Sequence, residues 1–179
     1  TNGKSTTTAL IDHIVRTAGL PSRMGGNIGL PILAQAPLPA GGVYVLELSS
    51  YQIDLTFSLD CDVSVLLNIT PDHLDRYDGF EGYVASKERL FAMQSPDRVA
   101  VIAVDDEVTR RIAKGLPHAR QVTARSVVPA DQSRWPALQG PHNAQNVAVA
   151  MAVADALGIA PDKTAEALAS YVSLPHRMQ

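Results

Sequence analysis

Long apolar runs, cysteine pairs and an excess of charge of one sign are all missing from this 179-residue chain. The apolar stretches are shorter than the ~18 residues that a membrane-spanning helix needs. Cys61 is the only cysteine, so no disulfide can form within the chain. The net charge of -3, without a basic stripe, argues against a general nucleic-acid binder. The sequence therefore predicts a cytoplasmic protein that has neither a membrane nor a nucleic acid as its partner.

The first six residues, TNGKST, match the second half of a phosphate-binding loop. In such a loop, backbone N–H groups wrap the phosphates, the lysine neutralises them, and the hydroxyl ligates Mg²⁺. The first glycine of the motif and its strand would precede Thr1. We therefore expect residues 1–179 to be one domain of a longer chain, truncated at its N-terminus. An Asn-Gly turn before an ordinary helix is the alternative.

Hydrophobic patterning predicts alternating strands and helices. Three nearly continuous apolar runs are strand candidates, at residues 43–48, 63–69 and 98–104. Helical spacing fits residues 4–18, 80–94, 105–115, 143–157 and 161–171. Strands that are apolar on both faces are typical of parallel sheets covered by helices. The pattern predicts an α/β fold with a mostly parallel, doubly wound sheet, a loop at 24–29 and an irregular stretch at 117–141.

In an open parallel sheet, ligands bind beyond the carboxyl ends of the strands. Glu47 interrupts the first apolar run, where an ionised carboxylate needs a partner. A Mg²⁺ ion shared with Ser5 and with ATP phosphates would be a suitable partner. A structural lysine or arginine is the alternative.

A second polar group follows the next strand, where Asp72, His73 and Asp75 crowd a short turn. Nitrogen and oxygen donors together suit a metal or the positioning of a phosphate. A solvated histidine beside helix-capping aspartates is the alternative.

Lys87 lies within the apolar stripe of helix 80–94. Such a lysine commonly extends its amine to solvent. If it is desolvated instead, its pKa falls and the neutral amine can take up CO₂ to form a carbamate. The carbamate is an anionic oxygen ligand, which would hold a second Mg²⁺ beside His73.

Asn143 and Asn146 are three residues apart at the start of helix 143–157, so they share one face. Carboxamides carry the donors and acceptors that recognition of an adenine edge requires. Capping of the helix by Asn143 is the alternative, and it is compatible with ligand binding.

Seven segments occur in a specific order: TNGKST, GGNIG, LELSSYQ, NITPDHLDR, ASKERLF, GPHNAQN and LPHRMQ. This set resembles the Mur ligases, the ATP-dependent amino-acid ligases of peptidoglycan synthesis, over the whole chain. LPHRMQ and LELSSYQ look most like the D-glutamate-adding members. The resemblance implies the P-loop NTPase-like central domain of a three-domain protein, between a UDP-binding domain and a C-terminal domain.

The resemblance also implies roles for individual residues. Those implied to bind ATP are Asn2, Gly3, Lys4, Ser5, Thr6, Asn143, Asn146 and Arg177. Two Mg²⁺ sites are implied, one at Ser5 and Glu47 and the other at His73 and a carbamylated Lys87. Asn27 and Ser49 are implied to face the UDP-muramoyl substrate, and Lys4, His73 and Lys87 to serve catalysis.

The implied reaction is the activation of an acyl group. The substrate carboxylate attacks the γ-phosphate of ATP, and the amine of D-glutamate then displaces phosphate from the acyl phosphate. Both steps build negative charge, which Lys4 and two Mg²⁺ ions would offset. The general base stays unassigned. The full-length protein is expected to be a monomer, and residues 1–179 alone are expected to lack ligase turnover.

Three alternatives remain open at this point. One is another Mur-type or folylpolyglutamate-type ligase. A second is a P-loop phosphotransferase or NTPase, which would use Lys4, Ser5 and Glu47 but not a carbamylated Lys87. A third is a nucleotide-binding regulatory module without chemistry, against which the intact set of Lys4, Glu47, His73 and Lys87 argues. The groups that select the amino acid are expected to lie mostly downstream.

Overall fold

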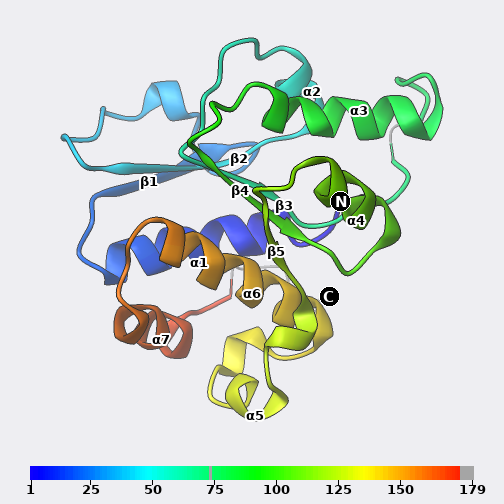
Figure 1. Cartoon of the computed structure of the whole chain (residues 1–179). Coiled ribbons are helices and arrows are strands. Elements are labelled where there is room, and N and C mark those ends of the chain that lie inside the picture. Colours follow the sequence, from blue (N-terminus) through cyan, green and yellow to red (C-terminus); the bar gives the residue numbers. More distant parts are fainter. Residues whose placement is uncertain (73, 174–179) are drawn as a thin grey trace. The chain divides into compact units, whose positions relative to one another are not determined.

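The computed structural model describes residues 1–72 and 74–173, which divide into two compact units (Figure 1). Unit 1 combines residues 1–2 with residues 48–121, and unit 2 combines residues 3–47 with the chain from residue 122 onward. The first strand of the chain and the first long helix therefore share a unit with its C-terminal helices.

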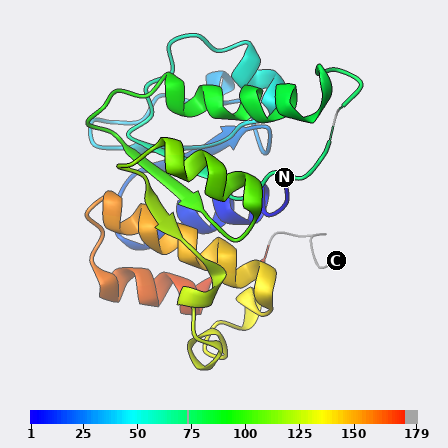
Figure 2. The same ribbon diagram turned by 45° about the vertical axis from the view of Figure 1, so that its right-hand side comes forward.

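Unit 2 contains a two-stranded parallel sheet of β1 (Ser22–Gly26) and β2 (Val43–Glu47). Helix α1 (Lys4–Thr17) packs against both strands and against α6 (Pro141–Ala156) and α7 (Pro161–Ser170), as Figures 1 and 2 show. Buried side chains of α1 and α6 supply much of its core, among them Leu10, Ile14, Val15, Val147 and Val149.

Proline begins two of the unit 2 helices. Helices α6 and α7 both begin with proline at their first position, Pro141 and Pro161, where a missing N–H costs no hydrogen bond. The shorter elements of this unit are η1 (Ile32–Ala34), η2 (Ala124–Ser126), α5 (Pro129–Gln132) and η3 (Pro136–Leu138).

Unit 1 is built on a three-stranded sheet in the order β3 (Val63–Leu66), β4 (Val99–Ala103) and β5 (Arg120–Val122). Strands β3 and β4 run parallel. Helices α2 (Ser50–Asp54), α3 (Gly79–Ala92) and α4 (Glu107–Gly115) complete the unit, with α2 packed on α3 (Figure 2). Its hydrophobic core includes Leu66, Ile69, Tyr83, Val84, Phe91, Ile102 and Ile112.

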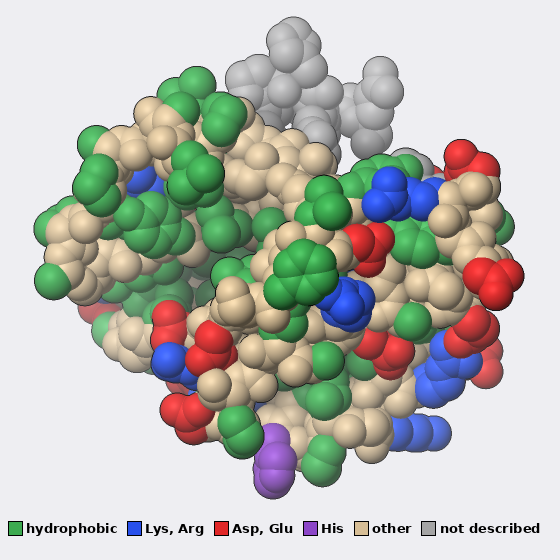
Figure 3. Space-filling model, turned by 90° about the horizontal axis from the view of Figure 1, so that it is seen from above, with side chains coloured by type: hydrophobic (Ala, Val, Ile, Leu, Met, Phe, Trp, Pro, Cys, Tyr) green, Lys and Arg blue, Asp and Glu red, His purple; other side chains and the backbone are tan. Residues whose placement is uncertain are grey.

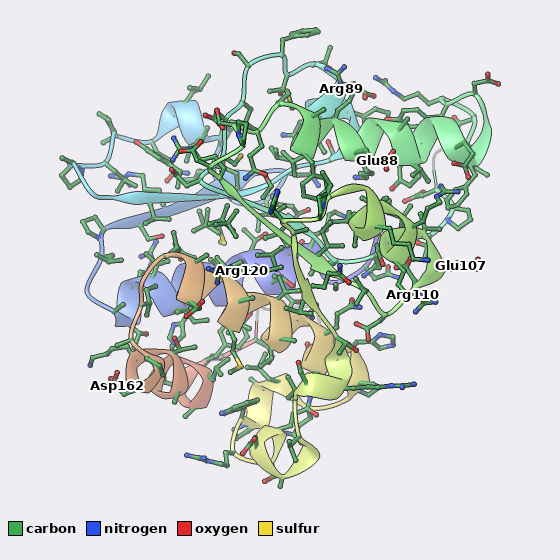
Figure 4. The ribbon with its side chains drawn as sticks, viewed as in Figure 1. Glu88, Arg89, Glu107, Arg110, Arg120 and Asp162 are labelled. Atoms are coloured by element: carbon green, nitrogen blue, oxygen red, sulfur yellow. The ribbon has the colours of Figure 1, made fainter. Side chains whose placement is uncertain are left out.

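Polar contacts and mixed charges characterise the surface of unit 1. Arg89 on α3 (Figure 4) donates from Nη2 to the carbonyl oxygen of Thr56, 3.0 Å away, which ties α3 to the segment after α2. On the face drawn in Figure 3, acidic and basic side chains are interspersed among hydrophobic ones. In the described part of the chain, no helix is long and apolar enough to cross a membrane.

The predicted class, parallel strands flanked by helices, is confirmed. All three predicted strands and all five predicted helices are present, with ends that differ by up to three residues. Several elements were missed, among them β5 and α5 in the stretch that was predicted to be irregular, β1 and α2. Residues 22–26 form β1 instead of belonging to a loop, and the described strands pair as two sheets. Helix α2 was also missed, although Ser49 and Gln52 carry the spacing of a capping box.

Candidate functional site

Helix α1 begins at Lys4, directly after Gly3, whose backbone is left-handed with φ of 82°. The N–H of Thr7 donates to the carbonyl oxygen of Gly3 at 2.9 Å, which closes the first turn. Because Gly3 has no side chain, it does not cap the N–H groups of that turn, and the turn contains no acidic residue. A helix N-terminus of this kind is suited to an anion such as a phosphate.

A buried carboxylate lies beside this turn. Glu47, at the end of β2, is 4% exposed and accepts a hydrogen bond from Ser5 Oγ to its Oε2 at 2.5 Å. Its Oε1 accepts from Asn27 Nδ2 at 3.0 Å, and its backbone oxygen accepts from the Asn27 N–H at 2.8 Å. Within residues 1–72 and 74–173, both carboxylate oxygens are thus contacted by neutral donors, and not by the lysine or arginine of the structural alternative.

This arrangement fits a divalent cation. An ionised carboxylate that is buried among neutral groups gains most from a cation. Mg²⁺ is usually bound by one or two protein oxygens together with phosphate oxygens and water. Ser5 Oγ and Glu47 Oε2 lie within hydrogen-bond distance of each other, so one ion can take both as ligands. Among residues 1–72 and 74–173, no three His, Cys, Asp or Glu side chains group as a metal site.

Gly26 is the residue that permits this geometry. Its φ is +94°, and a Cβ built on it would lie 2.2 Å from the backbone oxygen of Glu47. Only glycine allows the end of β1 to come this close to the end of β2. The glycines at the end of β1, which gave no strand pattern in the sequence, therefore allow Asn27 to lie next to Glu47.

Asn146, on α6, lies against the phosphate loop. Its Oδ1 accepts from Thr7 Oγ1 at 3.1 Å and would be 2.5 Å from a Cβ at Gly3. Its Nδ2 donates to Asn143 Oδ1 at 3.2 Å, and Asn143 Nδ2 donates to the carbonyl oxygen of Gln139 at 3.0 Å. The predicted common face of Asn143 and Asn146 is confirmed by this direct contact.

Two of the residues predicted from the sequence, Asn2 and Ser49, lie in unit 1 and form hydrogen bonds there. The backbone N–H of Asn2 donates to Asn68 Oδ1 at 2.7 Å, and Asn68 Nδ2 donates to the Asn2 carbonyl oxygen at 3.0 Å. Ser49 caps α2, and its Oγ accepts from the N–H of Gln52 at 3.3 Å. The anchoring role of Asn68 was not predicted, although a lone amide just after an apolar strand was a signal for it.

Lys87 is buried on α3, with 6% of its surface exposed, so it does not extend to solvent as lysines commonly do. Its Nζ lies 5.4 Å from the centroid of the Tyr83 ring, which is cation–π distance. Burial raises the pKa of the neighbouring Tyr83 phenol above its ordinary value.

A polar cluster around Asp54 lies next to Lys87 in unit 1, and sequence reasoning missed it. Asp54 Oδ2 accepts from Tyr77 Oη at 2.8 Å, and its Oδ1 accepts from Ser86 Oγ at 2.6 Å. Arg76 lies 3.8 Å from Asp54 Oδ2 and 4.1 Å from the centroid of Tyr51. The cluster joins α2, α3 and the turn that follows β3.

The predicted residues thus fall into three groups. Unit 2 brings together Gly3, Lys4, Ser5, Thr6, Asn27, Glu47, Asn143 and Asn146. Unit 1 contains Asn2, Ser49 and Lys87. His73 and Arg177 lie outside the described residues.

Comparisons with known proteins identify the family of this chain. Residues 1–135 match the Mur ligase middle domain family. Over its whole length the chain is 66% identical to a UDP-N-acetylmuramoylalanine--D-glutamate ligase from Zymomonas mobilis. It is 61% identical to the protein of that name from Sphingopyxis alaskensis. The chain spans only 41% and 42% of the length of these relatives.

A solved structure supports the fold. The chain superimposes on MurF from Acinetobacter baumannii with a TM-score of 0.75 and 20% identity, covering 99% of this chain and 46% of that one. At this identity the likeness concerns the fold alone. The family match over residues 1–135, with the phosphate loop and the buried Glu47 inside it, shows that this chain belongs to the Mur ligase middle domain family.

Proposed function

We propose that residues 1–179 are the central ATP-binding domain of a longer, monomeric cytoplasmic ligase. The proposed ligase adds D-glutamate to UDP-N-acetylmuramoyl-L-alanine during peptidoglycan precursor synthesis. Relatives that carry the D-glutamate ligase name over the whole chain support the choice of substrate. The observation that carries the proposal is the buried Glu47 hydrogen-bonded to Ser5 at the start of α1.

In this proposal the start of α1 binds the triphosphate of ATP. The first-turn N–H groups and the Lys4 ammonium contact the β- and γ-phosphates. Ser5 and Glu47 would hold a Mg²⁺ ion, and such an ion would supply positive charge to offset that of the phosphates. Asn27 orients Glu47 through its amide. Asn27 is itself exposed, so it also remains accessible to the UDP-muramoyl substrate, as the resemblance implies.

The proposal assigns the second Mg²⁺ site to His73 and to Lys87 as a carbamate. The burial of Lys87 supports this, because burial favours the neutral amine that reacts with CO₂. Nζ then forms a bond to the carbon of CO₂ and releases a proton, which leaves an anionic oxygen ligand. Ser49 at the substrate, and Asn143 and Arg177 at the nucleotide, complete the proposed contacts.

The decisive experiment is ATP-dependent phosphate release by the full-length protein. With UDP-N-acetylmuramoyl-L-alanine present, we expect D-glutamate to stimulate release, and L-glutamate, lysine and diaminopimelate not to do so. Stimulation by another amino acid would move the protein to a different ligase class. Release that needs neither acceptor nor amino acid would identify an NTPase. Residues 1–179 alone should not incorporate D-glutamate.

A Lys87→Ala variant of the full-length protein tests the carbamate. We expect ligase activity to be lost and to be partly restored by a high concentration of bicarbonate or a short carboxylic acid. Lys114→Ala is the matched control, because Lys114 is an exposed lysine on α4. An NMR signal of a carbamate carbon after addition of ¹³C-bicarbonate should appear in the wild type and not in Lys87→Ala. Wild-type activity of Lys87→Ala would exclude the carbamate.

A further inference from the structure

Asn146 has the geometry of a support behind the phosphate loop. Its side chain is 4% exposed, and its Oδ1 occupies the space where a side chain on Gly3 would begin, 2.5 Å from a built Cβ. The loop thus needs a glycine at position 3 for two reasons, the left-handed backbone and the carboxamide behind it.

The same oxygen also contacts the far end of the first turn of α1. Thr7 is buried and donates its hydroxyl to Asn146 Oδ1 at 3.1 Å. The Thr7 N–H donates to the Gly3 carbonyl oxygen, so Gly3 and Thr7 are the two ends of one helical turn. One carboxamide oxygen therefore bonds to one end of the turn that contains Lys4 and Ser5, and leaves no room for a side chain at the other end.

The amide nitrogen of Asn146 bonds to a residue outside the loop. Its Nδ2 donates to Asn143 Oδ1, and Asn143 Nδ2 donates to the Gln139 carbonyl oxygen. A carboxamide oxygen can accept two hydrogen bonds and its NH₂ group can donate two, and Asn146 uses one of each on Thr7 and Asn143. Asn143 is only partly buried, so it is the better placed of the two asparagines to contact a base.

We infer that Asn146 is a positioning residue for the phosphate loop. It acts through Thr7 and Gly3, holding the first turn of α1 so that Lys4 and the first-turn N–H groups face the phosphates. The inference rests on the proposed ATP site. It predicts that loss of Asn146 weakens the binding of phosphates whether or not a base is attached to them.

Binding of Mg²⁺-ATP and of Mg²⁺-tripolyphosphate, which lacks a base, tests the inference in the full-length protein. Asn146→Ala should weaken both by a similar factor, about tenfold, as expected for loss of a buried hydrogen bond. Thr7→Val should weaken both likewise, and the double variant should be no worse than Asn146→Ala. Thr7→Ser, which keeps the hydroxyl, should restore wild-type affinity.

Thr17→Val is the matched control on the same helix. The Thr17 hydroxyl donates to the His13 carbonyl oxygen one turn back, at 2.8 Å, and does not take part in the Asn146 contacts. It should leave both affinities unchanged. If Asn146→Ala does not fold, as judged by circular dichroism, the Thr7→Val and Thr7→Ser pair decides the question.

The outcomes separate the two proposals. Weaker ATP binding with unchanged tripolyphosphate binding in Asn146→Ala would identify an adenine contact and overturn the inference. Wild-type affinity of Thr7→Val for both ligands would also overturn it. A wild-type protein that binds neither ligand would overturn the proposed ATP site, and this inference with it.

Discussion

Units 1 and 2 each place a carboxylate between two neutral hydrogen-bond donors, but among the described residues only one of the two carboxylates also faces a cation. Glu47 in unit 2 accepts from Ser5 and Asn27. Asp54 in unit 1 accepts from Tyr77 and Ser86 and also has Arg76 at 3.8 Å. A carboxylate with its own arginine is suited to holding elements together. A buried one that is contacted by neutral donors is suited to binding a metal ion.

Of the substitutions that test this difference between the two carboxylates, Glu47→Gln should have the largest effect. The amide keeps the shape of the side chain and removes the charge that would bind Mg²⁺. We expect the kcat/KM of the full-length ligase to fall at least about 100-fold. The free energy of unfolding should stay the same or rise, because the burial of a charge is relieved. Mg²⁺ titration of activity and urea unfolding measure the two effects. A large loss of stability would instead make Glu47 a structural residue.

Gly26→Ala should be the most destabilising change in the sheet of unit 2. Its Cβ would lie 2.2 Å from backbone, at a positive φ of 94°. We expect more than about 2 kcal/mol of lost unfolding free energy. Gly29→Ala is the matched control, since Gly29 also has a positive φ but no atom within 4 Å of its built Cβ. It should cost about 1 kcal/mol. Equal losses in urea titrations would contradict the close approach of β1 and β2.

Asp54→Asn should show the opposite behaviour to Glu47→Gln. The side chain of Asp54 is 24% exposed, and its charge is matched by Arg76. Removing the charge should lower the free energy of unfolding by about 1 to 2 kcal/mol, because charged hydrogen bonds become neutral ones. Chemical denaturation with and without 1 M salt checks this, and about the same loss at both salt concentrations would assign the effect to hydrogen bonds. If Asp54→Asn were more stable than the wild type, the charge of Asp54 would not stabilise the fold, and Asp54 would not differ from Glu47 in this respect.

Asp60→Asn should have the smallest effect. The N–H and hydroxyl of Ser95, and then Arg98, lower the pKa of Asp60 below its ordinary value of 3.8. A lowered pKa in the folded state stabilises the protein above the unfolded pKa, and that stability is lost as the pH falls through the folded pKa. The melting temperatures of wild type and variant should therefore differ slightly at neutral pH and converge as the pH falls below about 5 and through the lowered folded pKa. Asp97→Asn is the matched control, because Asp97 is an exposed aspartate between Ser95 and Arg98, and it should leave the melting temperature at neutral pH unchanged.

The sequence by itself determined the five longer helices and three of the strands, because periodicity of apolar residues depends on near neighbours along the chain. It also pointed to Glu47 as a carboxylate in need of a partner, and it placed Asn143 and Asn146 on one face. The ordered motifs were sufficient to identify the family, which the match over residues 1–135 confirms.

Only the tertiary structure decided which groups meet across long separations in sequence. The approach of Gly26 to Glu47, the contact of Asn146 with Thr7 and the burial of Lys87 each depend on how elements pack. Strand β1 was missed for the same reason, since its glycines carry no apolar pattern and pair only because β2 lies beside them. Periodicity reports which face of an element is buried, whereas packing of whole side chains selects the partner on that face.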